Sequence, residues 1–245
     1  MGKRIKESDK GKSWAKKSLK SAKSIKIDSF KKILVITQDK ESSRNYLETW
    51  RSRLHGANTI IKVGKAVKKP MQIVEIVDTI RSELESKIAK SKSIERFVFD
   101  EVWVAFDKDS FPDFDSAVYA LRKKRKCGYR EAWSNECFEL WYLLHYMDIS
   151  SKSPIPRKLI FKECSKIFHV EHYEREKGSD ILHRDMALRP FKDVITAVKR
   201  AKQLDIATTS RCRGSSAQPS TLNPSTKLHN LIEEFIKMAS VGLNN

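Results

Sequence analysis

The chain has 245 residues, of which 40% are hydrophobic and 33% are charged, and its formal net charge is +18. This composition is typical of a globular protein and excludes a chain that is disordered along its whole length. No window reaches the roughly 18 apolar residues of a membrane helix, and the lysine-rich N-terminus lacks the apolar segment of a secretory signal. The four cysteines show no paired short spacing, which indicates reduced thiols in a cytoplasmic protein without a membrane partner.

The positive charge is concentrated at the N-terminus. Residues 1–32 hold 12 Lys/Arg and 3 Asp/Glu, a net charge of +9. A segment with so much like charge and so few apolar residues does not fold alone, so we expect a flexible basic arm over residues 1–30. Such an arm serves either solubility alone or contact with phosphates, for which Lys16 and Lys17 are candidates.

After the arm, short apolar runs typical of buried strands alternate with helical patterns. The spacing predicts a helix capped by Ser42 or Ser43, a long helix that begins at Pro70, and a helix that ends before Gly128. The apolar runs predict strands over residues 31–38, 58–64, 100–106 and 129–134.

The second half of the chain changes character. Asn135 is expected to cap an apolar helix, "CFELWYLLHY", after which "SSKSPIPRK" has the composition of a linker. A Ser/Thr-rich loop is expected near residues 208–226, and Ser225 or Thr226 then caps the last helix. Helices are predicted over residues 137–146, 158–169, 179–204 and 226–240.

The alternation of strands and helices predicts an α/β domain over residues 31–148, with a mostly parallel four-stranded sheet flanked by helices. An all-helical region follows over residues 149–245. In parallel sheets the ligand site lies beyond the carboxyl ends of the strands. Gln38 and Asp107 stand at two such ends.

The motif with the clearest chemistry is "VWVAFDKDSF", in which Asp107 and Asp109 follow an apolar strand. Two carboxylates at this spacing can hold Mg²⁺ or Mn²⁺ once the strand breaks into a loop. The alternative without a function is a solvated turn that is rich in aspartate. Phosphatases that use Asp-x-Asp carry it on the first strand, whereas here it follows the third. An acid after the first strand and Asp-x-Asp after the third is the Toprim arrangement of topoisomerases, primases and some nucleases.

Three stretches carry a resemblance to one family. "DEVWVAFDKDSFPDFDSAV", "AWSNECFELWYLLHY" and "NPSTKLHNLIEEF" resemble the RloB-like family, Toprim proteins of prokaryotic defence and restriction loci, and the resemblance spans residues 33–240. It implies a metal-dependent nuclease or nuclease-like effector of phage defence, often encoded beside an ATPase. The expected substrate is nucleic acid, either RNA such as tRNA or DNA.

The first motif departs from the family's pattern. The family's glutamate falls on Gln38, its glycine on Asp39 and its second glutamate on Ser43. An amide cannot accept a proton at physiological pH, although its carbonyl oxygen can still coordinate weakly. Asp39 or Glu41 can take over if the backbone is shifted. Two interpretations stay open: a competent nuclease, and a weakened Toprim protein that acts as a nucleic-acid-binding or regulatory subunit of an ATPase-containing complex.

Glu139 is another acidic candidate. It lies four residues after Asn135, so both side chains are expected to share one face of a helix. Either they form a polar stripe that meets solvent, or the Glu139 carboxylate belongs to the site and orients a metal or water, with Asn135 as a supporting residue. The resemblance favours the functional interpretation.

A basic run completes the predicted site. It lies at the end of the helix that follows the Asp-x-Asp loop, and part of its charge complements the helix dipole. The excess predicts contact with the nucleic-acid backbone near the metal. The run comprises Arg122, Lys123, Lys124, Arg125 and Lys126.

Overall fold

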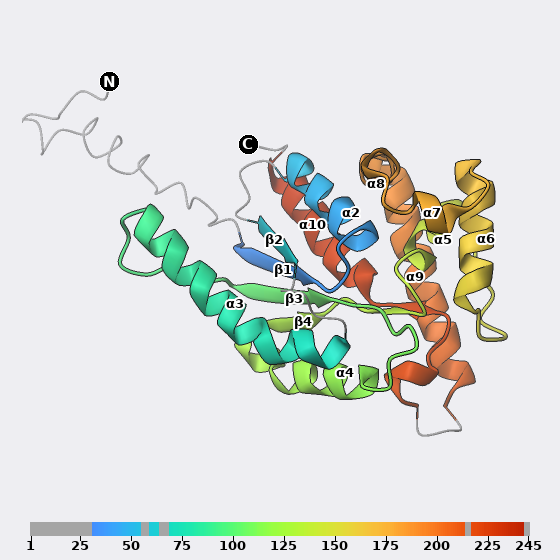
Figure 1. The fold of residues 1–245 in the computed structure, drawn as a ribbon, viewed down its shortest axis with the longest axis horizontal. Coiled ribbons are helices and arrows are strands. Elements are labelled where there is room, and N and C mark those ends of the chain that lie inside the picture. Colours follow the sequence, from blue (N-terminus) through green and yellow to red (C-terminus); the bar gives the residue numbers. More distant parts are fainter. Residues whose placement is uncertain (1–30, 55–58, 64–68, 214–216, 243–245) are drawn as a thin grey trace, which may run out of the picture. The chain divides into compact units, whose positions relative to one another are not determined.

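The fold is built around a parallel β-sheet with the strand order β2-β1-β3-β4 (Figure 1). The computed structural model describes residues 31–54, 59–63, 69–213 and 217–242. The predicted arm at 1–30, with Lys16 and Lys17, therefore lies outside the described residues. The strands are β1 (Ile33–Thr37), β2 (Thr59–Val63), β3 (Glu101–Ala105) and β4 (Tyr129–Glu131).

Helices cover both faces of the sheet because successive side chains of a strand point to opposite faces. Leu34 and Ile36 pack with α3 (Pro70–Ser91) and α4 (Phe114–Lys123). Ile33 and Val35 pack in a second core with side chains of α2 (Ser42–Trp50) and of the C-terminal helices. Figure 1 shows α3 and α4 on one side of the sheet, and α2 and the last helix, α10 (Leu228–Gly242), on the other.

Apart from α10, the C-terminal helices gather beyond the carboxyl ends of the strands (Figure 1). The helix predicted over 179–204 is two helices, because Pro190 disfavours helical backbone in the residue before it. The second of the two continues to Arg211, into the predicted loop. The helices are α5 (Leu140–Tyr146), α6 (Arg157–Phe168), α7 (Tyr173–Glu176), α8 (Asp180–Ala187), α9 (Phe191–Arg211) and α10 (Leu228–Gly242).

A short antiparallel pair joins the two halves of the chain. β5 (Ser134–Asn135) pairs with β6 (Ser225–Thr226), so the region after residue 149 is helical but not all-helical as predicted. Asn135 therefore belongs to a strand and does not cap α5, whose cap position is Glu139. Thr226, the predicted cap of α10, belongs to β6, but its hydroxyl still accepts the Leu228 N–H at the start of that helix, at 3.2 Å.

The described chain confirms an α/β protein with a parallel sheet flanked by helices and a helical C-terminal part. Lys31–Asn245 form one compact unit, and one core contains side chains from both predicted regions. Within the described ranges, no helix is long and apolar enough to cross a membrane. Short 3-10 helices complete the fold: η2 (Arg51–Arg53), η3 (Arg125–Cys127) and η4 (Pro219–Thr221).

Candidate functional site

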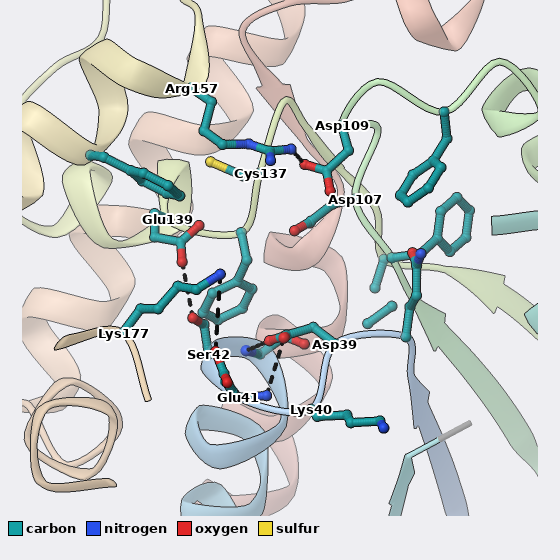
Figure 2. Close-up of a pocket in the computed structure, with 18 residues that line it drawn as sticks. Asp39, Lys40, Glu41, Ser42, Asp107, Asp109, Cys137, Glu139, Arg157 and Lys177 are labelled. Carbon is teal, nitrogen blue, oxygen red and sulfur yellow. Dashed lines mark hydrogen bonds and ion pairs between the residues drawn. The ribbon is translucent and has the colours of Figure 1, made fainter. Parts of the chain in front are cut away.

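A cavity of about 550 Å³ opens at the carboxyl ends of β1 and β3 (Figure 2). Thr37 is paired with Ala105, so the residues that follow, Gln38 and Asp107, reach the same edge of the sheet. The Gln38 N–H donates to the Ala105 carbonyl at 2.9 Å. The lining residues are Gln38, Asp39, Lys40, Glu41, Ser42, Ser43, Ala105, Phe106, Asp107, Asp109, Phe111, Ala132, Cys137, Phe138, Glu139, Arg157, Phe161 and Lys177.

Asp107 lies at the centre of the acidic lining. Its backbone forms a parallel bridge with Ser134, which continues the β3 alignment past the end of the strand. Burial raises the pKa of the Asp107 carboxyl well above its ordinary value, and the charges of Glu139 and Asp39 raise it further. A hydrogen bond from the Phe138 backbone and the charge of Arg157 act in the opposite direction. Asp107 is thus an acid whose ionised form lacks sufficient positive charge nearby.

Glu139 is a second buried acid in the cavity, with 4% of its surface exposed. Its Oε1 accepts hydrogen bonds from the Ser42 hydroxyl at 2.9 Å and from the Tyr173 hydroxyl at 3.3 Å. Burial raises the pKa of Glu139, while the bonds from Ser42 and the Cys137 thiol partly offset that rise. The carboxyl is therefore held in place by α2 and by α7.

Asp39 and Glu41, the two possible substitutes for the missing glutamate, differ in their surroundings. The Asp39 carboxylate accepts the Glu41 N–H at 3.1 Å and the Ser43 N–H at 2.7 Å, so Asp39 holds the first turn of α2. The predicted serine cap is thus wrong. Glu41 is half-exposed at the rim, where its carboxylate lies 4.0 Å from the Lys177 ammonium. Asp39 is therefore the substitute whose charge acts on Asp107.

Asp109 forms an ion pair with a cation of the cavity lining. Its backbone has a positive φ of 44°, and its carboxylate forms an ion pair with Arg157, the first residue of α6 (Figure 2). Glu136 ties both partners down: its carbonyl accepts the Asp109 N–H at 3.0 Å, and its carboxylate accepts the Arg157 N–H at 2.9 Å. The two aspartates of the Asp-x-Asp motif therefore differ in their surroundings: Asp109 pairs with Arg157, whereas Asp107 is buried near Glu139 and Asp39.

The donor chemistry of the cavity suits a hard divalent cation. The lining contains five acidic and three basic residues, in a protein of net charge +18. Mg²⁺ takes oxygen ligands and needs one or two carboxylates besides phosphate and water. Across the described ranges, no group of three or more His, Cys, Asp or Glu side chains gathers closely enough to hold a metal ion. A cation in this cavity would therefore have few protein ligands, with Asp107 as a candidate among them.

Two predictions about the surroundings of the site are wrong. The Asn135 side chain lies outside the cavity lining and donates to the Ser220 carbonyl at 2.9 Å, because β5 pairs with β6. The basic run ends at Gly128, whose carbonyl accepts the Val102 N–H at the start of β3, so the run lies at the opposite end of the strand from Asp107. Two members of the run, Arg122 and Lys124, pair with Glu131 and Asp78. The other three members, Lys123, Arg125 and Lys126, are exposed.

Sequence reasoning missed both cations that face the acids. Arg157 follows Pro156 at the end of the predicted linker, and Lys177 lies between α7 and α8. Neither stands in a motif, and both are distant in the chain from Asp107, so no local signal identified them. They come from the C-terminal helical region, whereas Asp39 and Asp107 follow strands of the sheet.

Comparison with known proteins agrees with this architecture. A family model described as "RloB-like protein" matches residues 33–235, which is most of the chain and includes every acid of the cavity. No curated protein and no solved structure matches the chain. The matched span begins at the first residue of β1 and ends within α10, so it covers both the sheet and the helices that complete the cavity. The chain therefore belongs to the RloB-like protein family.

Proposed function

We propose that the protein is a metal-dependent endonuclease of the Toprim type that acts on nucleic acid. The observation that carries this proposal is the meeting of Asp39, Asp107 and Glu139 in one cavity, from three separate parts of the chain. Burial and mutual repulsion raise the pKa of Asp107, and burial raises that of Glu139. Carboxylates with raised pKa values are stabilised when a cation binds beside them, and raised pKa values within one cavity mark functional sites.

In this proposal Asp107 holds Mg²⁺ or Mn²⁺ together with Asp109 or Asp39. When bound, the cation stabilises charge on the scissile phosphate and lowers the pKa of water. We assign proton transfer to Glu139, because a raised carboxyl pKa brings a general acid or base closer to neutral pH. Ser42 and Tyr173 orient that carboxyl through their hydrogen bonds.

The proposed substrate is RNA, such as tRNA, or DNA. A net charge of +18 attracts a polyanion without regard to its sequence. Family membership extends the proposal to a cytoplasmic effector of phage defence that works beside an ATPase from a neighbouring gene. The acidic cavity then captures the cation while the basic exterior captures the nucleic acid.

Cleavage by the purified full chain tests the proposal. Labelled tRNA and plasmid DNA are incubated with the protein in Mg²⁺ or Mn²⁺, alone and with the neighbouring ATPase. We expect the Asp107→Asn variant to lose at least about a hundredfold in rate, the scale of a lost electrostatic contact to the reacting group. Asp148→Asn is the matched control, because the Asp148 side chain is 84% exposed and lies outside the cavity. Cleavage that survives Asp107→Asn unchanged would contradict the assignment of this cavity.

A weakened Toprim protein, serving as a nucleic-acid-binding or regulatory subunit of an ATPase-containing complex, is the second candidate. Gln38 favours it, because Gln38 lines the cavity where the family's pattern has an acid. Gln38→Glu separates the two functions. The competent enzyme cuts with Gln38 in place, whereas a weakened protein cuts only after the acid is restored.

A further inference from the structure

The cavity has a division of charge that the metal-site proposal leaves unexplained. Its acids Asp39 and Asp107 come from the α/β region, while Arg157 and Lys177 come from the helical region (Figure 2). Lys40 also lines the cavity, but its side chain points away from the acids (Figure 2). A positive group inside a cation site opposes the binding of a metal, so its presence calls for a separate role.

Arg157 is placed in the cavity by its backbone. Pro156 holds an extended conformation before α6, and Arg157 is the first helical residue. The Arg157 N–H donates to the Glu136 carboxylate at 2.9 Å, while the Glu136 carbonyl accepts the Asp109 N–H. One residue thus anchors both members of the Arg157–Asp109 ion pair. The fixed backbone at the start of α6 keeps the Arg157 side chain within reach of the cavity.

The ion pair is open to exchange. The side chains of Arg157 and Asp109 keep 37% and 26% of their surface exposed, so water and ligands reach them. The buried Nε of Arg157 has no hydrogen-bond partner among the described residues. A guanidinium has a planar set of donors that matches a carboxylate or a phosphate in two parallel bonds. A phosphate would therefore satisfy a donor that Asp109 leaves unsatisfied.

We propose that Arg157 is the phosphate-binding residue of the cavity, and that it exchanges Asp109 for a phosphodiester of the incoming strand. This inference rests on the proposed nuclease function and deepens it. In the substrate-free protein Arg157 holds the Asp109 carboxylate and limits its use as a metal ligand. When a phosphate of the nucleic-acid strand binds Arg157, the Asp109 carboxylate is released and can bind the metal together with Asp107. Substrate and metal therefore favour each other's binding, since each removes a competitor of the other.

Two binding measurements on the full chain test the exchange without cleavage. Mn²⁺ affinity is measured by electron paramagnetic resonance without nucleic acid, and single-stranded RNA and DNA affinity by fluorescence anisotropy in EDTA. We expect Arg157→Gln to tighten Mn²⁺ binding about fivefold and to weaken oligonucleotide binding about fivefold, the scale of one partly exposed ion pair. Lys158→Gln is the matched control, because Lys158 is the next residue of α6 and is exposed. It removes the same charge and should change either affinity less than twofold.

Arg157→Lys is a second, conservative variant that separates loss of the phosphate contact from loss of the fold. Circular dichroism checks that every variant is folded. Arg157→Lys keeps the charge but loses the paired donors, so oligonucleotide binding should fall while the helix start is retained. Mn²⁺ binding that is unchanged or weaker in Arg157→Gln overturns the inference, as does equal weakening of oligonucleotide binding by Lys158→Gln. A wild-type protein that shows the exchange but cuts nothing contradicts the nuclease function alone. A wild-type protein that binds no Mn²⁺ contradicts both.

Discussion

At the scale of single residues, Asp107 is held in a position that is costly for its charged form. The residues that raise its pKa, Glu139 and Asp39, are themselves fixed by hydrogen bonds, so repulsion is not relieved by movement. Functional sites often retain such unfavourable groups, and replacing them stabilises the fold while it removes activity. The charged form of Asp107 in the cavity therefore lowers the free energy of unfolding of the protein.

Asp107→Asn should make the folded protein more stable at neutral pH. The folded pKa of Asp107 lies above its unfolded value, so wild-type stability is full below about pH 4 and declines as the pH rises toward the folded pKa. We expect the Tm of the variant to exceed the wild-type Tm by about 3 °C at pH 8, or about 1 kcal/mol for a chain of this size, and to equal it at pH 4. Differential scanning calorimetry measures both.

Asp148→Asn serves again as the control for this measurement. Its carboxylate is exposed and pairs with Arg200 at 3.0 Å, so the substitution removes a weak attraction instead of a repulsion. It should give no gain in Tm at either pH. A gain for Asp107→Asn of the same size at pH 4 and pH 8 would show that packing, and not charge, is the cause.

At the scale of secondary structure, Gly128 sets the turn between η3 and β4. Its φ is +89°, and an added Cβ would lie 2.7 Å from the Asp100 carbonyl oxygen. Its own carbonyl accepts the N–H of Val102, the second residue of β3. The glycine thus allows two neighbouring strands to begin side by side, at the end of the sheet away from the cavity.

Gly128→Ala should destabilise the protein and leave the cavity intact. The strained backbone and the close contact with Asp100 should lower the free energy of unfolding by about 1–3 kcal/mol, measured by urea denaturation. Gly178→Ala is the comparison, because its nearest contact is the Glu41 side chain at 4.0 Å. Mn²⁺ affinity, which reports on the cavity, should be unchanged in Gly128→Ala at temperatures where it stays folded. Equal stability of the two variants would contradict the strain at Gly128.

Much of the element pattern could be predicted from the sequence. Local signals identified β1 and β3 by their apolar runs and the start of α3 by Pro70, because these signals do not depend on distant residues. The start of α5 was not predictable in the same way. Residues 137–139 continue the apolar run, but Asn135 pairs with β6 about 90 residues later, so the helix begins only at Leu140.

The part of the site that follows the strands could be predicted from the sequence, whereas the part contributed by the C-terminal helices could not. Parallel strands bring their carboxyl ends together, and that rule alone predicts that Gln38 lies near Asp107. The Arg157 contact with Asp109 depends on how α6 packs against the sheet, and no spacing rule reaches that far. The basic run was misplaced because chain proximity to the Asp-x-Asp loop was taken for spatial proximity. The ten-residue α4 in fact carries the run to the other end of the sheet.

At the scale of the whole molecule, the net charge of the chain and the charge of the cavity lining have opposite signs. The chain carries +18 overall, yet acids outnumber bases in the lining of the cavity. The exposed bases Lys123, Arg125 and Lys126 lie at the other end of the sheet from the cavity. In the proposed function these three bases attract the polyanion at a distance from the cation, whereas Arg157 contacts it inside the cavity, so the distant attraction can be altered by itself.

Replacing Lys123, Arg125 and Lys126 together by Gln should weaken capture only. We expect the slope of log Kd against log salt concentration to fall by about 2, in line with the loss of two or three phosphate contacts. The cleavage rate at saturating substrate should stay at the wild-type value, since none of the three lines the cavity. Anisotropy titrations at several salt concentrations measure the slope. An unchanged slope would remove the run from the contact surface.

The pairing of β5 with β6 also sets the order in which the cavity can be completed. Asp107 bridges to Ser134, and Ser134 pairs with Thr226. During synthesis the α/β strands emerge first, then Arg157 and Lys177, and Thr226, the partner of Ser134, emerges 92 residues after Ser134. A nascent chain that contains all the acids but ends before Ser225 therefore lacks the β5–β6 pair beside Asp107. The proposed nuclease would thus stay incomplete until Thr226 has been synthesised.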